Sequence, residues 1–462
     1  MHPIKHLYAR AGFGLSPKEW NDKTSFSRSK AIDELFSHAK RAAKQPIVLD
    51  HSIISAKLGM SMDMSVEMDK KKKNKQRKTL VARQNIQWIN RMADPKESAL
   101  LEKMMLFWHG HFACQPQGEY ALHYTNILRT HALGNFRELV HAIAKSPAMI
   151  KYLNNQQNRK KSPNENFARE LMELFTIGHG HYTEQDIKEA ARAFTGWGTE
   201  KSEPVFKFSK FFHDYGTKTF MGKSGDFNGE EIIDIILKKP AVAEFIVTKI
   251  YYFFINEIPD QKIIASLSKQ FYDSDYDIAG VMRTIFNSDW FYDKKNVGNQ
   301  IKSPVYLLAN LLRTVDVKFK DPYVLIKIQQ ALGQMIFVPP NVAGWPGGKG
   351  WIDNTTLLLR LNLTAYVFKA AQKGFLGRKN LSVNNQKALR QLDVVVSVKD
   401  IEKILKDKSN NDIFKELEAL LLSNNSVYTT TDFNALLIKK NKSDFIKTTI
   451  LALSALPEFQ VC

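Results

Sequence analysis

The chain has 462 residues, with 66 lysines and arginines against 47 aspartates and glutamates, and so carries a formal net charge of +19. Hydrophobic residues make up 44% of it, which is enough for a large core, and no apolar run reaches the ~18 to 20 residues that a transmembrane helix needs. The positive charge suits an anionic partner, but the RRM, zinc-finger and KH signatures are absent, which argues against nucleic acid.

The cysteines and the first residues bear on the compartment. Cys114 and Cys462 are the two cysteines and lie far apart in the sequence, which argues against a disulfide framework and fits a reducing compartment. The opening stretch, MHPIKHLYARAGFG, places charges where a signal peptide has its apolar segment. We therefore expect a cytoplasmic protein by default, or an exported one if a leader has been trimmed from the chain.

Helix-start signals recur along the chain. Residues 16–19, SPKE, place an N-cap serine before a proline at the first helical position and a glutamate that can reach back, which is a capping box. Residues 94–97, DPKE, and 162–165, SPNE, repeat this pattern, while Asn135 and Thr183 open looser versions. Apolar residues at helical spacing follow, so the sequence predicts a predominantly α-helical protein. Further helices are expected over residues 241–257, 261–274, 277–287 and 303–315.

Two segments depart from the helical pattern. Residues 199–229 are rich in glycine, lysine and aromatic residues, and PVFKFSKFFHD within them alternates enough to predict a short hairpin. Residues 337–351, FVPPNVAGWPGGKGW, are rich in proline and glycine and predict a long loop of the kind that often has a function. The expected fold class is therefore all-α with a small non-helical, β-hairpin arm.

Charge and polarity suggest how the chain is organised. The tract from Asp69 to Lys78, DKKKKNKQRK, holds seven basic residues and one acid, and it predicts a mobile, solvated insertion over about residues 60–78. We expect residues 1–360 to form one helical domain that carries this insertion and the arm. Residues 361–462 are expected to form a C-terminal helical extension packed on the same domain, with a polar, lysine-rich connection over 376–412.

The histidines are confined to one part of the sequence. All 12 lie at or before residue 213, and FWHGHF places His109 and His111 at the end of a predicted helix, on either side of Gly110. Two histidines spaced in this way can share a divalent metal ion if the chain leaves the helix between them. If the helix continues, their side chains point about 200° apart and only face the negative end of the helix dipole. A single H-x-H motif is a weak signal and favours the second reading.

The helix expected to open in SPNE carries a polar face opposite its apolar stripe. Asn166, Glu170 and Glu173 lie at i, i+4 and i+7 on that face, and Arg169 can pair with glutamates four residues away. A charged, solvated helix face is the plain alternative, and we prefer it for Glu173. Asn164, Asn166 and Glu170 would suit metal ligation or acid–base catalysis if histidines lie beside them.

A second polar pair lies in the non-helical arm, where FHDYGTKTFMG contains His213 and Asp214. An adjacent histidine and aspartate can act as a ligand pair or an acid–base couple, or can simply hold a turn. We predict that Asn166 and Glu170 face one of the histidine clusters and not bulk water. The candidate residues are, as catalytic groups, Glu170, His213 and Asp214; as binding groups, Asn164, Asn166, Arg169 and Trp345; and as metal ligands, His109 and His111.

Eight stretches of the sequence, in order, resemble a known bacterial family. They are HLYARAGFG, LFWHGHFA, HALGNFREL, SPNENFARELMELFTIG, YTEQDIKEAARAFTGW, HDYGTKTFMG, VPPNVAGWPGG and PEFQ, and they span His6 to Gln460. Together they resemble the family catalogued as domain of unknown function 1800. The resemblance implies a helical domain without an assigned reaction. It also implies a partner, because many relatives carry export signals and look to be encoded beside an exported companion similar to alkaline-phosphatase-type proteins.

Three functions stay open at this point. The first is a hydrolase, dependent on a metal or on acid–base groups, that acts on an envelope or extracellular polymer. The second is a non-catalytic module that binds or escorts a partner protein through its helical surface and the Trp345 loop. The third is binding of an acidic polymer or nucleic acid through the lysine tracts. The P-loop, G-x-S-x-G and H-E-x-x-H motifs are absent, which argues against the commonest nucleotide-binding and hydrolase classes.

Overall fold

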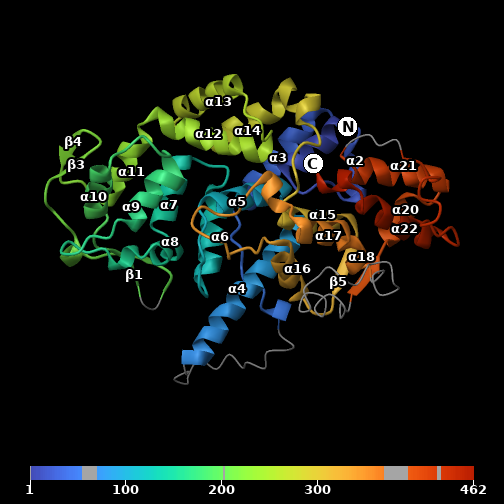
Figure 1. The fold of residues 1–462 in the computed structure, drawn as a ribbon, viewed down its shortest axis with the longest axis horizontal. Coiled ribbons are helices and arrows are strands. Elements are labelled where there is room, and N and C mark those ends of the chain that lie inside the picture. Colours follow the sequence, from blue (N-terminus) through green and yellow to red (C-terminus); the bar gives the residue numbers. More distant parts are fainter. Residues whose placement is uncertain (1, 55–69, 201–202, 369–393, 424–427) are drawn as a thin grey trace.

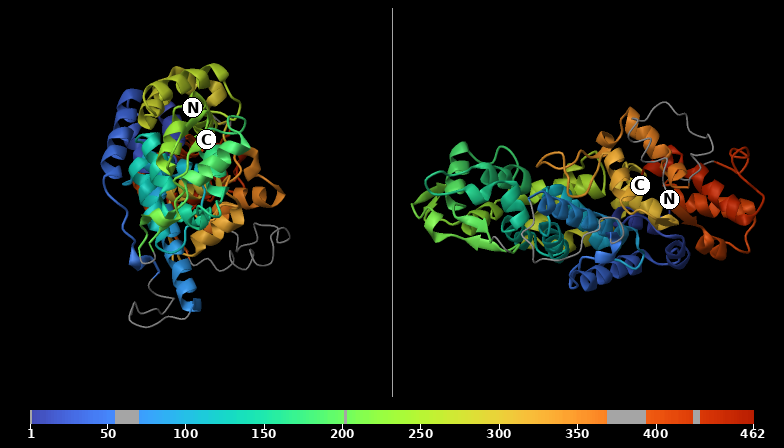
Figure 2. Two further views of the ribbon diagram at one scale, coloured as in Figure 1. Left: turned by 90° about the vertical axis from the view of Figure 1, so that its left-hand side faces the viewer. Right: turned by 90° about the horizontal axis from the view of Figure 1, so that it is seen from below.

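The computed structural model describes residues 2–54, 70–200, 203–368, 394–423 and 428–462. These residues form a predominantly helical protein with short antiparallel strand pairs, which confirms the predicted fold class. The molecule is elongated, and the two ends of the chain lie near each other (Figure 1, Figure 2). One cluster of buried apolar side chains extends from Ile4 to Cys462 and so connects the first helix with the last residues.

The N-terminal helices surround one central helix. They are α1 (Pro3–Ala11), α2 (Pro17–Lys23), α3 (Arg28–Ala43), α4 (Lys70–Ala93), α5 (Ala99–His111), α6 (Tyr120–His131), α7 (Phe136–Ala144) and α8 (Pro147–Tyr152). Every residue of α5 except Gly110 is buried, and α1, α3, α4 and α6 all pack against it. A helix that is buried on all sides has to lie inside a large protein, and α5 lies near the middle of Figure 1.

The start of α5 differs from the prediction. Asp94 was expected to cap this helix, but the helix begins five residues later, and the Ser98 hydroxyl accepts a hydrogen bond from the Leu101 amide at 3.4 Å. Glu97 was expected to reach back to Asp94 and instead pairs with Arg91 at 2.6 Å. The prediction was wrong because an arginine on the preceding helix competes for the glutamate.

The first turns of α4 contain part of the predicted insertion. Residues 70–78 are helical, and further along the same helix Trp88 and Ile89 are fully buried. Most of residues 71–78 are exposed, as predicted, but they are helical; their mobility stays a prediction, and residues 60–69 lie outside the described part of the chain. Lysine is a good helix former, and a helix anchored in the core at one end propagates through exposed turns at the other. The exposed end projects from the body at the bottom of Figure 1.

The middle of the chain is also helical. It contains α9 (Asn166–Glu170), the π-helical turn η3 (Leu171–Thr176), α10 (Glu184–Ala193), α11 (Gly229–Leu237), α12 (Pro240–Phe254), α13 (Gln261–Asp273), α14 (Ile278–Asn287) and α15 (Pro304–Thr314). The last four confirm the predicted ranges to within three residues at each end. Capping is also as predicted at Ser16, Asn135 and Thr183.

The helix start predicted at Ser162 was wrong. Ser162 and Arg159 exchange backbone hydrogen bonds of 2.8 and 3.4 Å, which hold this segment as a narrow bridge. The helix α9 begins four residues later, where the Asn164 side chain accepts a hydrogen bond from the Asn166 amide at 3.0 Å. Ser162 does not cap a helix because the bridge to Arg159 holds its backbone in an extended conformation.

Alanine substitutions at Thr183 and Ser162 should distinguish a residue that caps a helix from one that does not. Thr183→Ala removes the hydroxyl that accepts from the Asp186 amide at 3.1 Å, and should reduce the free energy of unfolding by about 0.5–2 kcal/mol. Ser162→Ala, at an exposed residue without a capping bond, should change it by no more than about 0.5 kcal/mol. Urea denaturation of both variants checks this. A larger loss for Ser162→Ala would contradict the observed helix start.

The arm contains two small hairpins. β1 (Trp197–Thr199) pairs with β2 (Phe206–Phe208), and β3 (Lys218–Phe220) pairs with β4 (Lys223–Gly225), both antiparallel. The predicted strand character is confirmed at β2, but its partner β1 lies before the stretch PVFKFSKFFHD, in which the hairpin was expected. The pair β3 and β4 was not predicted, because its strands lack a clear alternation. A third antiparallel pair joins β5 (Asp316–Phe319) to β6 (Val394–Ser397), far apart in the sequence.

The C-terminal part of the chain packs against the first helices. Its helices are α16 (Val324–Leu332), α17 (Asn354–Leu361), α18 (Leu363–Val367), α20 (Lys399–Ile404), α21 (Asn410–Leu421) and α22 (Lys442–Ser454). The Lys5 amine of α1 donates to the Ala419 and Leu422 carbonyl oxygens at the end of α21, and α20 contacts α2. The division of the chain near residue 360 stays a prediction.

Candidate functional site

His109 is sealed in an aromatic environment. Its Nε2 accepts a hydrogen bond from the Phe337 amide at 3.0 Å, and its ring lies 5.4 Å from Trp88 and 5.2 Å from Trp345, between centroids. Burial lowers the pKa of His109 to about 3, so the imidazole is neutral at pH 7. Its role in this arrangement is to join α5 to the loop that begins at Phe337.

His111 serves a different segment. Because α5 continues through this residue, the two imidazoles point about 200° apart around the helix. The His111 Nε2 donates to the Phe175 carbonyl oxygen at 2.9 Å, inside the π-helical turn, and the ring is surrounded by Phe107, Phe112 and Phe175. Burial holds the pKa of His111 well below its ordinary value. The structure therefore does not bring His109 and His111 together as a pair.

The proline- and glycine-rich loop covers the end of α5. Gly344 has φ +86°, and a Cβ there would collide with the Gly110 carbonyl oxygen. This close approach requires glycine at Gly344, and it fixes Trp345, half-buried, above His109. Two of the motifs that carry the family resemblance, LFWHGHFA and VPPNVAGWPGG, are thus explained by packing against each other.

The polar face after Asn164 does not turn toward these histidines. Asn166 is exposed, contrary to the prediction, and its amide nitrogen donates to the Leu153 carbonyl oxygen at 3.1 Å. Asn164 is half-buried, and its backbone amide donates to Asn158 Oδ1 at 2.9 Å. Arg169 binds Glu184 through two hydrogen bonds of 2.9 and 2.7 Å. These contacts stabilise the loop and the surface of α9.

Glu170 lies at the edge of a small group of acids. It is half-buried, and its pKa is raised by burial and then by the charge of Glu173, with Arg169 opposing. Glu173 itself pairs with His179 Nε2 at 3.1 Å and accepts a hydrogen bond from the Tyr182 hydroxyl at 3.4 Å. Within the described residues, no hydrogen bond or ion pair joins the Glu170 carboxylate to an imidazole.

His213 and Asp214 hold the arm to α10. Arg192 donates to both carboxylate oxygens of Asp214, at 2.8 and 3.3 Å, and Asp214 also accepts a bond from the Gly216 amide at 2.8 Å. His213 is buried, and its Nδ1 donates to the Thr195 carbonyl oxygen at 2.9 Å. This matches the alternative in which the two residues hold a turn.

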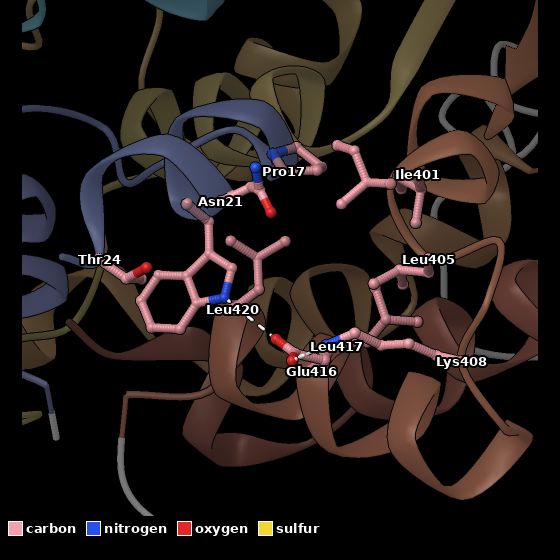
Figure 3. Close-up of a pocket in the computed structure, with 11 residues that line it drawn as sticks. Pro17, Asn21, Thr24, Ile401, Leu405, Lys408, Glu416, Leu417 and Leu420 are labelled. Atoms are coloured by element: carbon pink, nitrogen blue, oxygen red, sulfur yellow. Dashed lines mark hydrogen bonds and ion pairs between the residues drawn. The ribbon is translucent and has the colours of Figure 1, made fainter.

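A cavity of about 140 Å³ lies between α2 and the helices α20 and α21 (Figure 3). Its apolar lining comes from Trp20, Ile401, Ile404, Leu405, Leu417 and Leu420. Trp20 Nε1 donates to Glu416 at 3.4 Å, and Glu416 also pairs with Lys408, so the charges in the lining are compensated. Its space is comparable to that of an apolar cavity that holds one benzene molecule.

An open groove of about 570 Å³ lies between α4 and α16. Three lysines of α4 and three apolar residues of the α16 region line it: Lys71, Lys75, Lys78, Tyr323, Ile326 and Met335. None of the nine candidate residues lines this groove or the cavity of Figure 3. The charge of the tract was visible in the sequence, but its apolar counterpart was missed, because no pattern indicates that residues about 250 positions apart are neighbours.

Neither a metal-holding cluster nor a membrane-spanning helix occurs among the described residues. In the ranges that the structure describes, no group of three or more His, Cys, Asp and Glu side chains is arranged to hold a metal ion. Within the same ranges, no helix is both long and apolar enough to span a membrane.

Comparison with protein-family models gives a match over nearly the whole chain. A family model described as "Protein of unknown function (DUF1800)" matches residues 6–461, nearly the whole chain. No curated protein and no solved structure matches it.

Proposed function

Because the chain belongs to the DUF1800 family, whose description assigns no function, we propose from its surface that it is a non-catalytic module that binds an acidic segment of a partner protein. The segment would lie in the groove between α4 and α16. One observation supports this proposal above the others: the groove combines a row of lysines with an apolar floor.

The lysines form a continuous cationic edge. Lys71, Lys75 and Lys78 lie at i, i+4 and i+7, which places them on one face of α4, and all three are exposed. The helix contains no aspartate or glutamate to neutralise them from within. An acidic partner would be attracted over a distance of about one Debye length, ~8 Å at physiological salt.

The floor favours a protein segment over a nucleic acid. Ile326 is buried, and Tyr323 and Met335 are half-buried, so the groove offers apolar surface at its base. Phosphate contacts alone would leave this surface unused, whereas leucine or phenylalanine side chains of a peptide would cover it. A volume of about 570 Å³ is within the range of ligand sites in proteins and has room for several side chains.

The placement of the polar motifs is consistent with a binding role. His109, His111 and His213 are each buried and hydrogen-bonded to backbone groups. Groups used in this way stabilise a particular packing of the core and do not face an incoming substrate.

Fluorescence anisotropy with three labelled probes tests the proposal. The probes are an amphipathic peptide of glutamate and leucine, polyglutamate, and a DNA duplex. The peptide should bind most tightly, because it matches both the charge and the apolar floor. Charge reversal by Lys75→Glu with Lys78→Glu should weaken peptide binding by about tenfold or more, equivalent to ~1.4 kcal/mol.

The matched control makes the same charge reversal on a different surface of the protein. Lys40→Glu with Lys44→Glu changes two exposed lysines of the α3 end by the same total charge and should leave binding within about twofold. Equal losses of peptide affinity in both double variants would show nonspecific attraction and overturn the proposal that the groove is the binding site. Equal binding of all three probes with a steep salt dependence would favour the acidic-polymer function instead.

A second proposed function is hydrolysis of an envelope or extracellular polymer, with Glu170 as the acid–base group. The raised pKa of its half-buried carboxyl, beside Glu173, supports this candidate, because burial favours the protonated form that a general acid needs. Release of soluble fragments from insoluble peptidoglycan or chitin should then be lost in Glu170→Gln and retained in Glu165→Gln. An absence of fragments from the unmodified protein would count against hydrolysis and leave the binding proposal intact.

A further inference from the structure

Four buried cationic side chains come from α1, α5, the segment that precedes α15, and α17. Arg10, Lys103, Lys302 and Arg360, here called the cationic cluster, have side chains between 1% and 5% exposed. Arg10 and Lys302 both act electrostatically on Lys103, and Arg360 acts on Lys302. The Lys103 Nζ also lies 4.1 Å from the ring centroid of Tyr306.

The hydrogen bonds of the two arginines are incomplete. The Arg10 Nη2 donates to the Asn296 carbonyl oxygen at 2.8 Å and to Asn299, but its Nε and Nη1 are buried without a partner. The Arg360 Nη2 donates to the Lys302 carbonyl oxygen at 2.5 Å, and its Nε and Nη1 are likewise unpartnered. Each guanidinium therefore has buried donors that find no acceptor among the described residues.

No aspartate or glutamate of the described residues forms an ion pair with the cluster. Cys462 acts on Arg10, Lys103 and Lys302 with the sign of a negative charge, and Glu257 acts on Arg10 more weakly, but neither accepts a hydrogen bond from the unpartnered arginine nitrogens. Lys5, which lies near Lys302, is satisfied differently, because its amine binds carbonyl oxygens at the negative end of α21. The cluster has no such helix end.

Loss of protons cannot remove all of this charge. Burial lowers the pKa of Lys103 and of Lys302 to about 7, so these amines can become neutral. An arginine stays protonated, and burial lowers the pKa of Arg360 only to about 10. Two buried positive charges remain at neutral pH, and a buried charge without a partner is strongly unfavourable.

We propose that the cationic cluster binds a small inorganic anion, of the class of chloride or phosphate, between Arg10, Lys103 and Lys302. The unpartnered nitrogens of Arg10 donate to it. The bound anion therefore connects α1 and α5 with the segment that precedes α15 and contains Lys302. This site is buried and separate from the groove of α4, so the proposal of an anion site does not depend on the proposed function.

Thermal unfolding of the full chain in different sodium salts tests the site. Chloride, phosphate and gluconate are compared at pH 7 and constant ionic strength, gluconate serving as an anion too large to enter. Chloride or phosphate should raise Tm in a saturable way over gluconate, and at 100 times its Kd the anion lowers the unfolding equilibrium constant by about 100-fold. The more effective of the two identifies the ligand. Identical Tm values in the three salts would overturn the proposal.

Two lysine variants locate the effect. Lys103→Met should weaken the apparent affinity for the anion by about tenfold or more. Lys249→Met is the matched control, because burial also lowers the pKa of Lys249, to about 8, and its amine lies over Phe245, outside the cluster. Loss of the response in the control, with the response kept in Lys103→Met, would overturn the proposed position.

Diffraction gives a measurement that does not depend on a folded variant. Crystals of the unmodified protein soaked in sodium bromide should show an anomalous peak in contact with Arg10 and Lys103. Bromide peaks confined to the protein surface would overturn the proposal.

Discussion

Lowering the pH from 6.5 to 4.5 is expected to reduce the free energy of unfolding by about 5 kcal/mol through the buried histidines His6 and His109, and His111 acts in the same direction. Burial lowers the pKa of His6 and of His109 to about 3, and holds that of His111 well below its ordinary value. In the unfolded chain each histidine titrates near pH 6.5. Between pH 6.5 and about 3 the unfolded state thus binds more protons than the folded state, so stability is lost as the pH falls through this window.

The size follows from the two pKa values. A histidine that titrates near 6.5 in the unfolded chain and near 3 in the folded one costs about 2.3 kcal/mol over this interval, because the slope rises from half of 1.4 kcal/mol per pH unit at pH 6.5 to the full value below it, and two such histidines give the total. Urea unfolding at pH 6.5, 5.5 and 4.5 measures it. His109→Gln keeps a hydrogen-bond acceptor for the Phe337 amide and removes one titrating group, so this variant should lose about 2 kcal/mol less over the interval. An equal loss in both proteins would show that His109 takes up its proton in the folded state.

Glu102→Gln is expected to destabilise the protein by about 3–5 kcal/mol. Glu102 is fully buried, and its carboxylate accepts hydrogen bonds from Trp88 at 2.9 Å, from Arg91 at 3.0 Å and from Arg129 at 2.8 Å. The amide keeps the shape but removes the charge, which leaves the buried Arg129 without compensation. Chemical denaturation at pH 7 measures the loss.

The control is a glutamate with similar bonds on the surface. Glu184 also binds an arginine, Arg169, through both carboxylate oxygens, but it is exposed. Glu184→Gln should therefore cost no more than about 1 kcal/mol. If both variants lost the same amount, burial would not determine the strength of these ion pairs.

The helices of this protein could be predicted from local patterns, and their exact starts only in part. The capping boxes at Ser16 and Thr183 are local, since donor and acceptor lie three residues apart. The starts expected at Asp94 and Ser162 failed because Arg91 and Arg159 compete for the same groups. A pattern within four residues contains no information about such competitors.

The candidate site was less predictable than the fold. The lysines of α4 were visible as a run of charge, but the run looked like an insertion because the core contacts of Trp88 follow ten residues later. The apolar floor at Tyr323 belongs to another part of the sequence. One signal for the cationic cluster was present, since Lys103 is a single cation between leucines and methionines in α5.

The contact of Lys5 with the end of α21 has a consequence for synthesis on the ribosome. The amine and the Leu422 carbonyl oxygen are separated by 417 residues, and the first helix buries eight of its nine residues. At ~5–20 residues per second, about 20–80 s pass between translation of α1 and of its last partner. During that time α3 and α5 can cover part of α1, but the side that meets α21 stays uncovered, so we expect the nascent chain to bind chaperones that act close to the ribosomal exit.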